Sequence, residues 1–307
     1  MTAILRKELA DYFTSIRFVV LFILIFFVSA AGLVGASQGI RAANLPEGIV
    51  FLGLFTTSGT VIPSLTYLVA LLVPIIGIAL GFDAINSERT GGTLSRVMSQ
   101  PVFRDSVING KFLAGIVTLS VMVATMMFLV AGFGLRMIGV PPTAEEIIRL
   151  FFYLFLTIVY GAFWMGLAIL FSVVFRRVAA SLLFALALWL FFSIFILLVA
   201  PAIANAIVPT AGGSEVELIR NVELQQMITR ISPNILFQEA TMVLLVPLVR
   251  SLGMVATSQA AYMIPNPLSL GQSLLVVWPH LTSLVSLSAI CFAISYLLFM
   301  RQEIRAT

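Results

Sequence analysis

Residues able to do chemistry are scarce in this 307-residue chain, which holds 17 basic and 13 acidic side chains, one histidine (His280) and one cysteine (Cys291). One polar segment, residues 84–111, concentrates four of the basic ones. They are Arg89, Arg96, Arg104 and Lys111. Clustered charges of this kind form charge-assisted hydrogen bonds with a protein partner. The alternative, a solvated connector, is equally compatible with the composition of the segment.

Motifs for catalysis are absent from the sequence. Gly110-Lys111 is followed by Phe112, with no glycine five residues earlier, so there is no Walker A loop. We therefore predict that the chain does not hydrolyse ATP itself and is not an enzyme. No HExxH, GxSxG or Gly-rich dinucleotide motif occurs either. His280 stands beside Trp278 without an evident partnering carboxylate, and we interpret it as a membrane-interface residue.

Metal binding is not favoured by the sequence. A single cysteine excludes a disulfide framework and a Cys-based zinc site. The chain has 12 methionines, and Met122, Met126 and Met127 share one helix at a spacing that could offer soft ligands to copper. Methionine is also a common filler in helix packing, which is the interpretation we prefer. We predict no metal or cofactor in this chain.

The composition decides the class of protein. Hydrophobic residues make up 61% of the chain and charged residues 10%, with a mean hydropathy of +1.13. Soluble domains run near 45–50% apolar and about 25% charged. This excludes a soluble globular enzyme, a disordered chain and a nucleic-acid binder, in spite of a pI near 9.6. The sequence predicts an all-α polytopic membrane protein.

Six transmembrane helices are predicted from the stretches that lack charged residues. They lie near residues 18–36, 64–83, 112–136, 150–174, 178–200 and 279–300. With the N-terminus inside, 11 basic residues fall on the cytoplasmic side and 6 on the outer side, which favours N-in and C-in. The first span is long for a signal peptide and follows Glu8 and Asp11, so a retained helix is the favoured interpretation.

Residues 1–17 precede the first span and have the pattern of an amphipathic helix. Its apolar stripe comprises Leu5, Leu9, Tyr12, Phe13 and Ile16, while Arg6 and Lys7 occupy other faces. Such a helix lies in the inner membrane interface with its cations near the lipid head groups. A frayed start to the first span is the alternative.

The segment 84–111 contains a possible short helix between the second and third spans. Thr93 can cap it, Pro101 ends it, and Leu94, Val97 and Met98 lie on one side. On the other side of the membrane, residues 201–277 form a long segment with helical patterns at 214–231 and from Ser232-Pro233 onward. We expect these helices to cover the outer face.

The segment 84–111 resembles that of the permease subunits of ABC-2-type ABC transporters. These permeases carry an acidic residue, a Gly-Thr-Leu step, a proline, an arginine and a Gly-Lys pair between their second and third helices. In this chain they are Glu88, Gly92-Thr93-Leu94, Pro101, Arg104 and Gly110-Lys111. Arg6-Lys7-Glu8-Leu9 resembles the elbow helix of the family. The nearest likeness is to the branch with the permease of the nitrous-oxide-reductase (multicopper-enzyme) maturation transporter, without copper carried over as a substrate.

The resemblance implies a prokaryotic plasma-membrane protein in which residues 1–307 form one transmembrane domain. Two copies, or this chain and a paralogue, would pair and bind two separate ATPase subunits that hold ATP and Mg²⁺. The ATPase-coupling residues would be Glu88, Arg89, Gly92, Thr93, Leu94, Arg96, Val97, Met98, Pro101, Arg104 and Lys111. The interfacial elbow would comprise Leu5, Arg6, Lys7, Leu9 and Phe13. An exporter is implied, with a possible extracytoplasmic partner at residues 201–277.

Two other functions remain open on the sequence alone. An intramembrane enzyme would need clustered His, Asp or Glu at membrane depth, and the predicted span interiors hold no charged residue. A sensor or assembly scaffold would share the topology without an ATPase. The uncharged span interiors also weaken proton- or sodium-coupled transport, which favours a protein whose energy comes from outside the chain.

Overall fold

The computed structural model describes residues 2–42, 50–92, 103–139, 141–210, 214–249, 252 and 267–302, and these form helices and connecting turns with no strand. Six helical stretches in this part of the chain are long and apolar enough to span a membrane. They are Ile16–Ile40, Leu65–Thr90, Arg104–Met137, Ala144–Val174, Val178–Ile207 and Leu270–Arg301. The predicted all-α fold with six candidate spans is confirmed.

Five of the spans are built on one main helix each. These are α2 (Ile16–Ala42), α4 (Leu65–Gly81), α7 (Arg104–Ile138), α8 (Ala144–Val174) and α14 (Leu270–Arg301). The fifth span in chain order joins α9 (Val178–Leu190), a π-helical segment (Phe191–Phe195) and α10 (Ile196–Ile207). The shorter helices are α1 (Thr2–Thr14), α3 (Val50–Thr56), α5 (Asn86–Thr90), α11 (Glu215–Thr229) and α12 (Pro233–Leu245).

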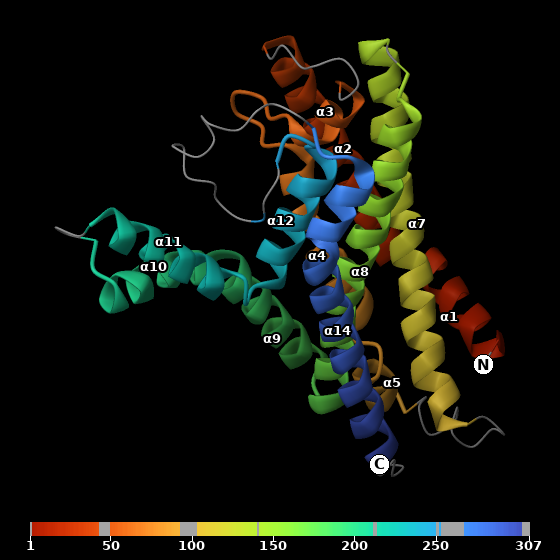
Figure 1. The fold of residues 1–307 in the computed structure, drawn as a ribbon. Coiled ribbons are helices and arrows are strands. Elements are labelled where there is room, and N and C mark those ends of the chain that lie inside the picture. Colours follow the sequence, from red (N-terminus) through yellow and green to blue (C-terminus); the bar gives the residue numbers. More distant parts are fainter. Residues whose placement is uncertain are drawn as a thin grey trace.

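Helix α8 forms the centre of the bundle, with α4 and α14 packed along it (Figure 1). Its large side chains Tyr153, Tyr160 and Trp164 are fully buried. The close approach of α4 depends on glycine, because a Cβ on Gly77 would lie 2.6 Å from the Gly161 carbonyl oxygen. Small residues at such crossings let membrane helices pack backbone to backbone.

The fifth span changes direction within its length. Figure 1 shows α9 rising beside the bundle and α10 turning away from it, so that α10 and α11 form a hairpin that projects sideways. The π-helical segment lies at the bend, as expected from the known link between π-bulges and kinks. The buried Asn221 holds the hairpin together, donating to Asn205 Oδ1 (2.9 Å) and to the Val208 carbonyl (2.7 Å).

Several span boundaries differ from the prediction, and the three largest shifts are at α7, α14 and the fifth span. Helix α7 begins at Arg104 instead of 112, α14 begins at Leu270 instead of 279, and the fifth span continues to Ile207 instead of ending at 200. The prediction cut helices at charges and prolines. In the structure Arg104 and Lys111 of α7 have partners in the chain, and Pro279 lies inside α14, whose start is fixed by a Ser269 capping box.

The predicted helices of the segment 201–277 are confirmed at α11 and α12. Ser214 caps α11, and Ser232-Pro233 begins α12 as the sequence indicates. Helix α12 packs against α4, α8 and α14 and lies alongside the last span (Figure 1). Most of the predicted coupling helix, from Thr93 to Pro101, lies outside the described residues.

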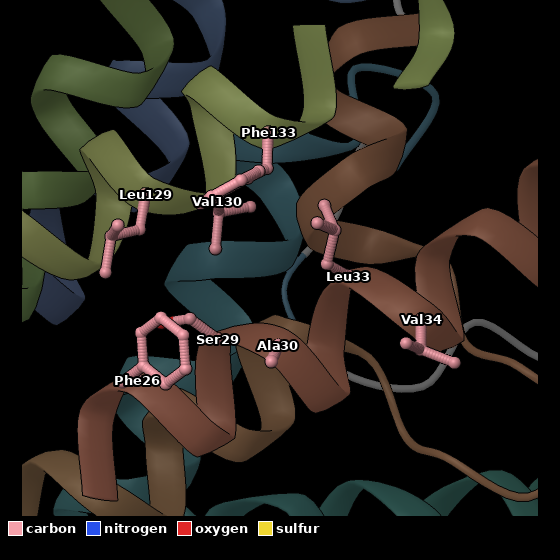
Figure 2. Close-up of a pocket in the computed structure, with 8 residues that line it drawn as sticks. All are labelled: Phe26, Ser29, Ala30, Leu33, Val34, Leu129, Val130 and Phe133. Atoms are coloured by element: carbon pink, nitrogen blue, oxygen red, sulfur yellow. The ribbon is translucent and has the colours of Figure 1, made fainter. Parts of the chain in front are cut away.

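An apolar groove of about 270 Å³ lies between α2 and α7. Figure 2 shows its lining side chains, which come from these two helices alone. They are Phe26, Ser29, Ala30, Leu33, Val34, Leu129, Val130 and Phe133. Phe26 and Phe133 are about half exposed, so the groove opens to the outside of the chain. An apolar lining of this kind suits contact with the hydrocarbon of a bilayer.

Candidate functional site

Helix α7 begins and α14 ends at the same end of the bundle, near the start of α1, and we call this the inner end (Figure 1). Charged side chains from α1, α5 and α7 meet there. Four of them form the inner charged cluster: Lys7, Glu8, Glu88 and Lys111. Lys111 Nζ lies 2.8 Å from Glu88 Oε1 and 3.0 Å from Glu8 Oε1. Lys7 Nζ reaches the same two oxygens at 3.4 and 3.1 Å. The cluster therefore joins α1, α5 and α7.

The two lysines of the cluster differ in exposure. The side chain of Lys111 is 5% exposed and that of Lys7 53%. Partial burial acts to lower the pKa of Lys7, but the charge and hydrogen bond of Glu8, with the charges of Glu88 and Asp11, raise it above its ordinary value. Removing one member of a buried pair leaves an uncompensated charge, so Lys111 is the structurally critical cation.

Helix α1 is fixed to the bundle by two further contacts, and the start of α2, at Arg17, is fixed by an ion pair. Tyr12 Oη donates to the Leu80 carbonyl of α4 at 2.8 Å, and Arg17 Nη1 lies 2.6 Å from Asp83 Oδ2. Gly110 permits close packing, because a Cβ there would lie 2.8 Å from Cγ2 of Ile4. Gly110 thus leaves room for α1, and Lys111 binds α1 through Glu8.

The predicted elbow residues are divided over the surface of α1. Leu5 and Leu9 are half-buried, Arg6 and Lys7 are exposed, and Phe13 is 39% exposed. The polar Glu8 is the residue of α1 that is buried. This helix thus binds the bundle through a charged residue at its centre, while part of its apolar stripe faces outward.

Helix α5 is held by the bundle on two sides. Ser172 Oγ of α8 accepts hydrogen bonds from the backbone N–H groups of Ile85 (2.9 Å) and Asn86 (3.1 Å), which lie at the start of α5. Gln302, just after α14, accepts from Arg89 through Oε1 and from Arg104 Nη1 through its carbonyl at 3.1 Å. Its Nε2 donates to the Val173 carbonyl of α8 at 2.8 Å. The inner ends of α5, α7, α8 and α14 are therefore joined.

Among the predicted coupling residues, Glu88 pairs with Lys111, and Arg89 and Arg104 both bond to Gln302. Gly92 lies in the turn after α5 at a φ of 66°, a conformation that favours glycine. Thr93, Leu94, Arg96, Val97, Met98 and Pro101 lie outside the described residues.

Sequence reasoning missed three residues of this site: Glu8, Ser172 and Gln302. One signal was available for Glu8, because the chain has only two lysines and both meet at this carboxylate. Ser172 and Gln302 carry no local signal, since their partners are 87 and 213 residues away in the sequence.

At the opposite end of the bundle, the first two turns of α8 hold the neighbouring helices. The fully buried Arg149 donates to the carbonyls of Leu244 (2.8 Å) and Leu268 (2.7 Å) and to Ser273 Oγ (3.1 Å). The buried Glu146 accepts from the backbone N–H groups of Phe51 and Leu52 at 3.0 and 3.3 Å. These bonds fix α3, α12 and α14 to α8.

A second charged group, the outer charged cluster, comprises Arg230, Glu239 and His280 from α11–α12 and α14. Glu239 Oε2 lies 2.6 Å from His280 Nε2 and 3.0 Å from Arg230 Nε. Burial acts to raise the pKa of Glu239, but the hydrogen bond from His280 and the charge of Arg230 lower it below its ordinary value. The interpretation that no carboxylate converges on His280 is wrong, because its partner comes from 41 residues away.

The three methionines considered as copper ligands belong to the packed core. Met122, Met126 and Met127 are buried among apolar neighbours. In the described part of the chain, no group of three or more His, Cys, Asp or Glu side chains could hold a metal ion.

The six candidate spans agree with one protein family. The sequence model of the family described as ABC-2 family transporter protein matches residues 2–304. The chain belongs to this family. It is a multi-pass protein of the plasma membrane and a transmembrane subunit of the ABC transporter type.

Two relatives agree with the branch indicated by the sequence. A probable ABC transporter permease protein NosY of Pseudomonas aeruginosa is 32% identical over 205 residues, which cover 62% of this chain and 65% of the relative. The protein of the same name from Stutzerimonas stutzeri is 37% identical over 109 residues, or 36% of each chain. The matches thus span less than two thirds of the length of either relative.

Proposed function

We propose that the chain is the permease subunit of an ATP-driven ABC transporter, in which separate ATPase subunits bind ATP and Mg²⁺. The observation that carries the proposal is the family match over residues 2–304. The relatives named as probable ABC transporter permeases support the same role. A second permease copy or a paralogue completes the membrane part, with N- and C-termini inside. The complex exports its substrate or transmits force to an extracytoplasmic partner at residues 201–277.

The geometry of the inner end supports a division of labour within the segment 84–111. Its flanking residues Glu88, Arg89, Arg104 and Lys111 have partners inside the chain. The central residues 93–101 hold the apolar anchors Leu94, Val97 and Met98 and contact the ATPase in our proposal. Motion of these residues then reaches the elbow helix through Lys111 and the last span through Gln302.

The proposal is tested by capture and ATP turnover. The full chain carries an affinity tag and is expressed with the ATP-binding-cassette subunit encoded beside it. We expect co-purification and ATP turnover in lipid vesicles, and loss of capture in the double variant Val97→Asp, Met98→Asp, because charge at apolar anchors opposes docking.

The control is Leu218→Asp with Ile219→Asp on the exposed face of α11, which keeps capture unchanged. Equal capture and turnover in the loop variant would overturn the coupling assignment. Absence of any ATPase partner would favour the assembly scaffold instead.

A further inference from the structure

A cavity of about 510 Å³ lies where the α11–α12 junction meets α14. Its walls combine one guanidinium, one imidazole and two hydroxyls with an apolar surface. The lining residues are Arg230, Ile231, Leu236, Pro279, His280, Ser283, Ser286, Leu287 and Ile290. None of the inner-end residues contributes to it, so the cavity serves a purpose separate from the coupling of an ATPase.

The cation of this cavity is held in place by the outer charged cluster. Arg230 Nε bonds to Glu239 Oε2 at 3.0 Å, and Nη2 donates to the Leu252 carbonyl at 3.0 Å. His280 bonds to the same oxygen of Glu239 from the other side. Within the described residues Arg230 Nη1 makes no hydrogen bond, and the side chain is 32% exposed. The guanidinium is thus fixed and still offers donors to a ligand.

The cavity follows the middle of the last span. Its contacts on α14 run from Pro279 to Ile290, about 16 Å at 1.5 Å per residue. On the same helix Val285, Ile290 and Ile294 are about half exposed, which places hydrocarbon of the bilayer next to the cavity. An arginine beside a membrane span is costly to bury and marks a candidate functional site.

We propose that this cavity binds an amphiphile with an anionic head group. The head binds Arg230 Nη1, and the exposed Ser286 hydroxyl is a second donor along the wall. The apolar chain lies on Leu287, Ile290 and Leu236. A carboxylate or phosphate matches the planar fork of arginine, and an apolar chain matches the wall. Free fatty acids and anionic phospholipids share this chemistry.

The experiment uses the full chain in detergent micelles and a fatty acid that carries a photoreactive diazirine on its chain. After irradiation, mass spectrometry maps the labelled residues. We expect label concentrated on the peptides with Leu236, Leu287 and Ile290. The methyl ester of the same probe, which lacks the anionic head, should label them at least about tenfold less, as expected from loss of a charge-assisted bond.

Two variants and one control make the assignment specific. Arg230→Gln should lower labelling about tenfold, while Arg220→Gln, an exposed arginine on α11, the helix that ends just before Arg230, should leave it unchanged. Ile290→Trp should also lower labelling, because the larger side chain at this exposed position narrows the cavity. This second variant keeps the test valid if Arg230→Gln does not fold.

Competition separates the two sources of the ligand. If oleic acid displaces the probe and phosphatidylglycerol does not, the site takes free fatty acids, and the reverse result identifies a phospholipid. Labelling spread evenly over all exposed spans, or unchanged in both Arg230→Gln and Ile290→Trp, would overturn the proposal.

Discussion

The two ends of the bundle use their charges in different ways. At the inner end, Lys7 and Lys111 share the carboxylates of Glu8 and Glu88, so each ion has more than one partner among side chains. At the outer end, the buried Arg149 pairs with Glu145 of its own helix, and two of its three hydrogen bonds to other parts of the chain go to backbone carbonyls. Shared side-chain pairs can exchange partners when helices shift, whereas bonds to backbone fix a helix.

This difference suggests which end moves. The inner charged cluster connects the elbow helix, α5 and α7, which flank the predicted ATPase contact. The Arg149 contacts hold α12 and α14 to α8 at the other end. We infer that the outer end of α8 is the fixed part of the subunit and that the inner end transmits motion.

The largest effect is expected at Arg149. Arg149→Leu leaves the carbonyls of Leu244 and Leu268 without their donor and should cost on the order of 3–5 kcal/mol of stability. Thermal unfolding in detergent and membrane abundance measure it. The exposed Arg220→Leu serves as the control and should change neither. A small effect at Arg149 would remove the basis for calling this end fixed.

The next effect separates the two lysines that share the same carboxylates. Lys111→Met should lower stability by on the order of 3 kcal/mol, because it removes a buried ion partner. Lys7→Met should cost below about 1 kcal/mol, because its side chain is largely exposed. The readout is the unfolding temperature of each variant. Equal losses would show that burial does not distinguish the two cations.

A smaller effect is expected at Gln302, the link between α5 and α14. Gln302→Ala should cost about 1–3 kcal/mol, since Arg89 loses its acceptor and the Val173 carbonyl its donor. Hydrogen exchange should become faster in α5 and stay unchanged in α3. Gln302→Glu keeps an acceptor for Arg89 and should recover part of the protection. Unchanged exchange in α5 would show that Gln302 does not hold this helix.

The smallest effect concerns acid and the outer charged cluster. The folded pKa of Glu239 lies below its ordinary value of 4.5, so its stabilising contribution is complete above that value and is lost as the pH falls through the folded pKa. The unfolding temperature should therefore fall more steeply at acid pH in the natural chain than in Glu239→Gln. Parallel curves would mean that the cluster contributes no pH-dependent stability.

The spans were predictable because a long apolar stretch without charged residues is stable in few environments other than the hydrocarbon of a membrane. The first two turns of α7 were not, since Arg104 and Lys111 look like loop residues until their partners are known. Their pairing with Gln302, Glu8 and Glu88 depends on helices far apart in the sequence.

In the charged clusters too, partners that lie far apart in the sequence could not be predicted. Glu88 and Lys111 were predicted as ATPase-coupling residues from one motif, and that role stays a prediction, whereas their ion pair within the chain was not predicted. The partnership of His280 with Glu239 was not predicted either, because nothing in the local sequence of either residue indicates the other. Tertiary packing of α12 beside α14 creates it.

The central claim, that Lys111 passes ATP-driven motion to the elbow helix, is tested most directly by a distance between the two permease copies of the proposed homodimer. A spin label at Ala10→Cys, on the exposed side of α1, is placed in a Cys291→Ser background. In the complex with its ATPase, the distance between labels should change between the nucleotide-free and the vanadate-trapped state. The account predicts that Lys111→Met abolishes this change while the ATPase stays bound. The same change in Lys111→Met, or no change in the natural chain, would contradict it.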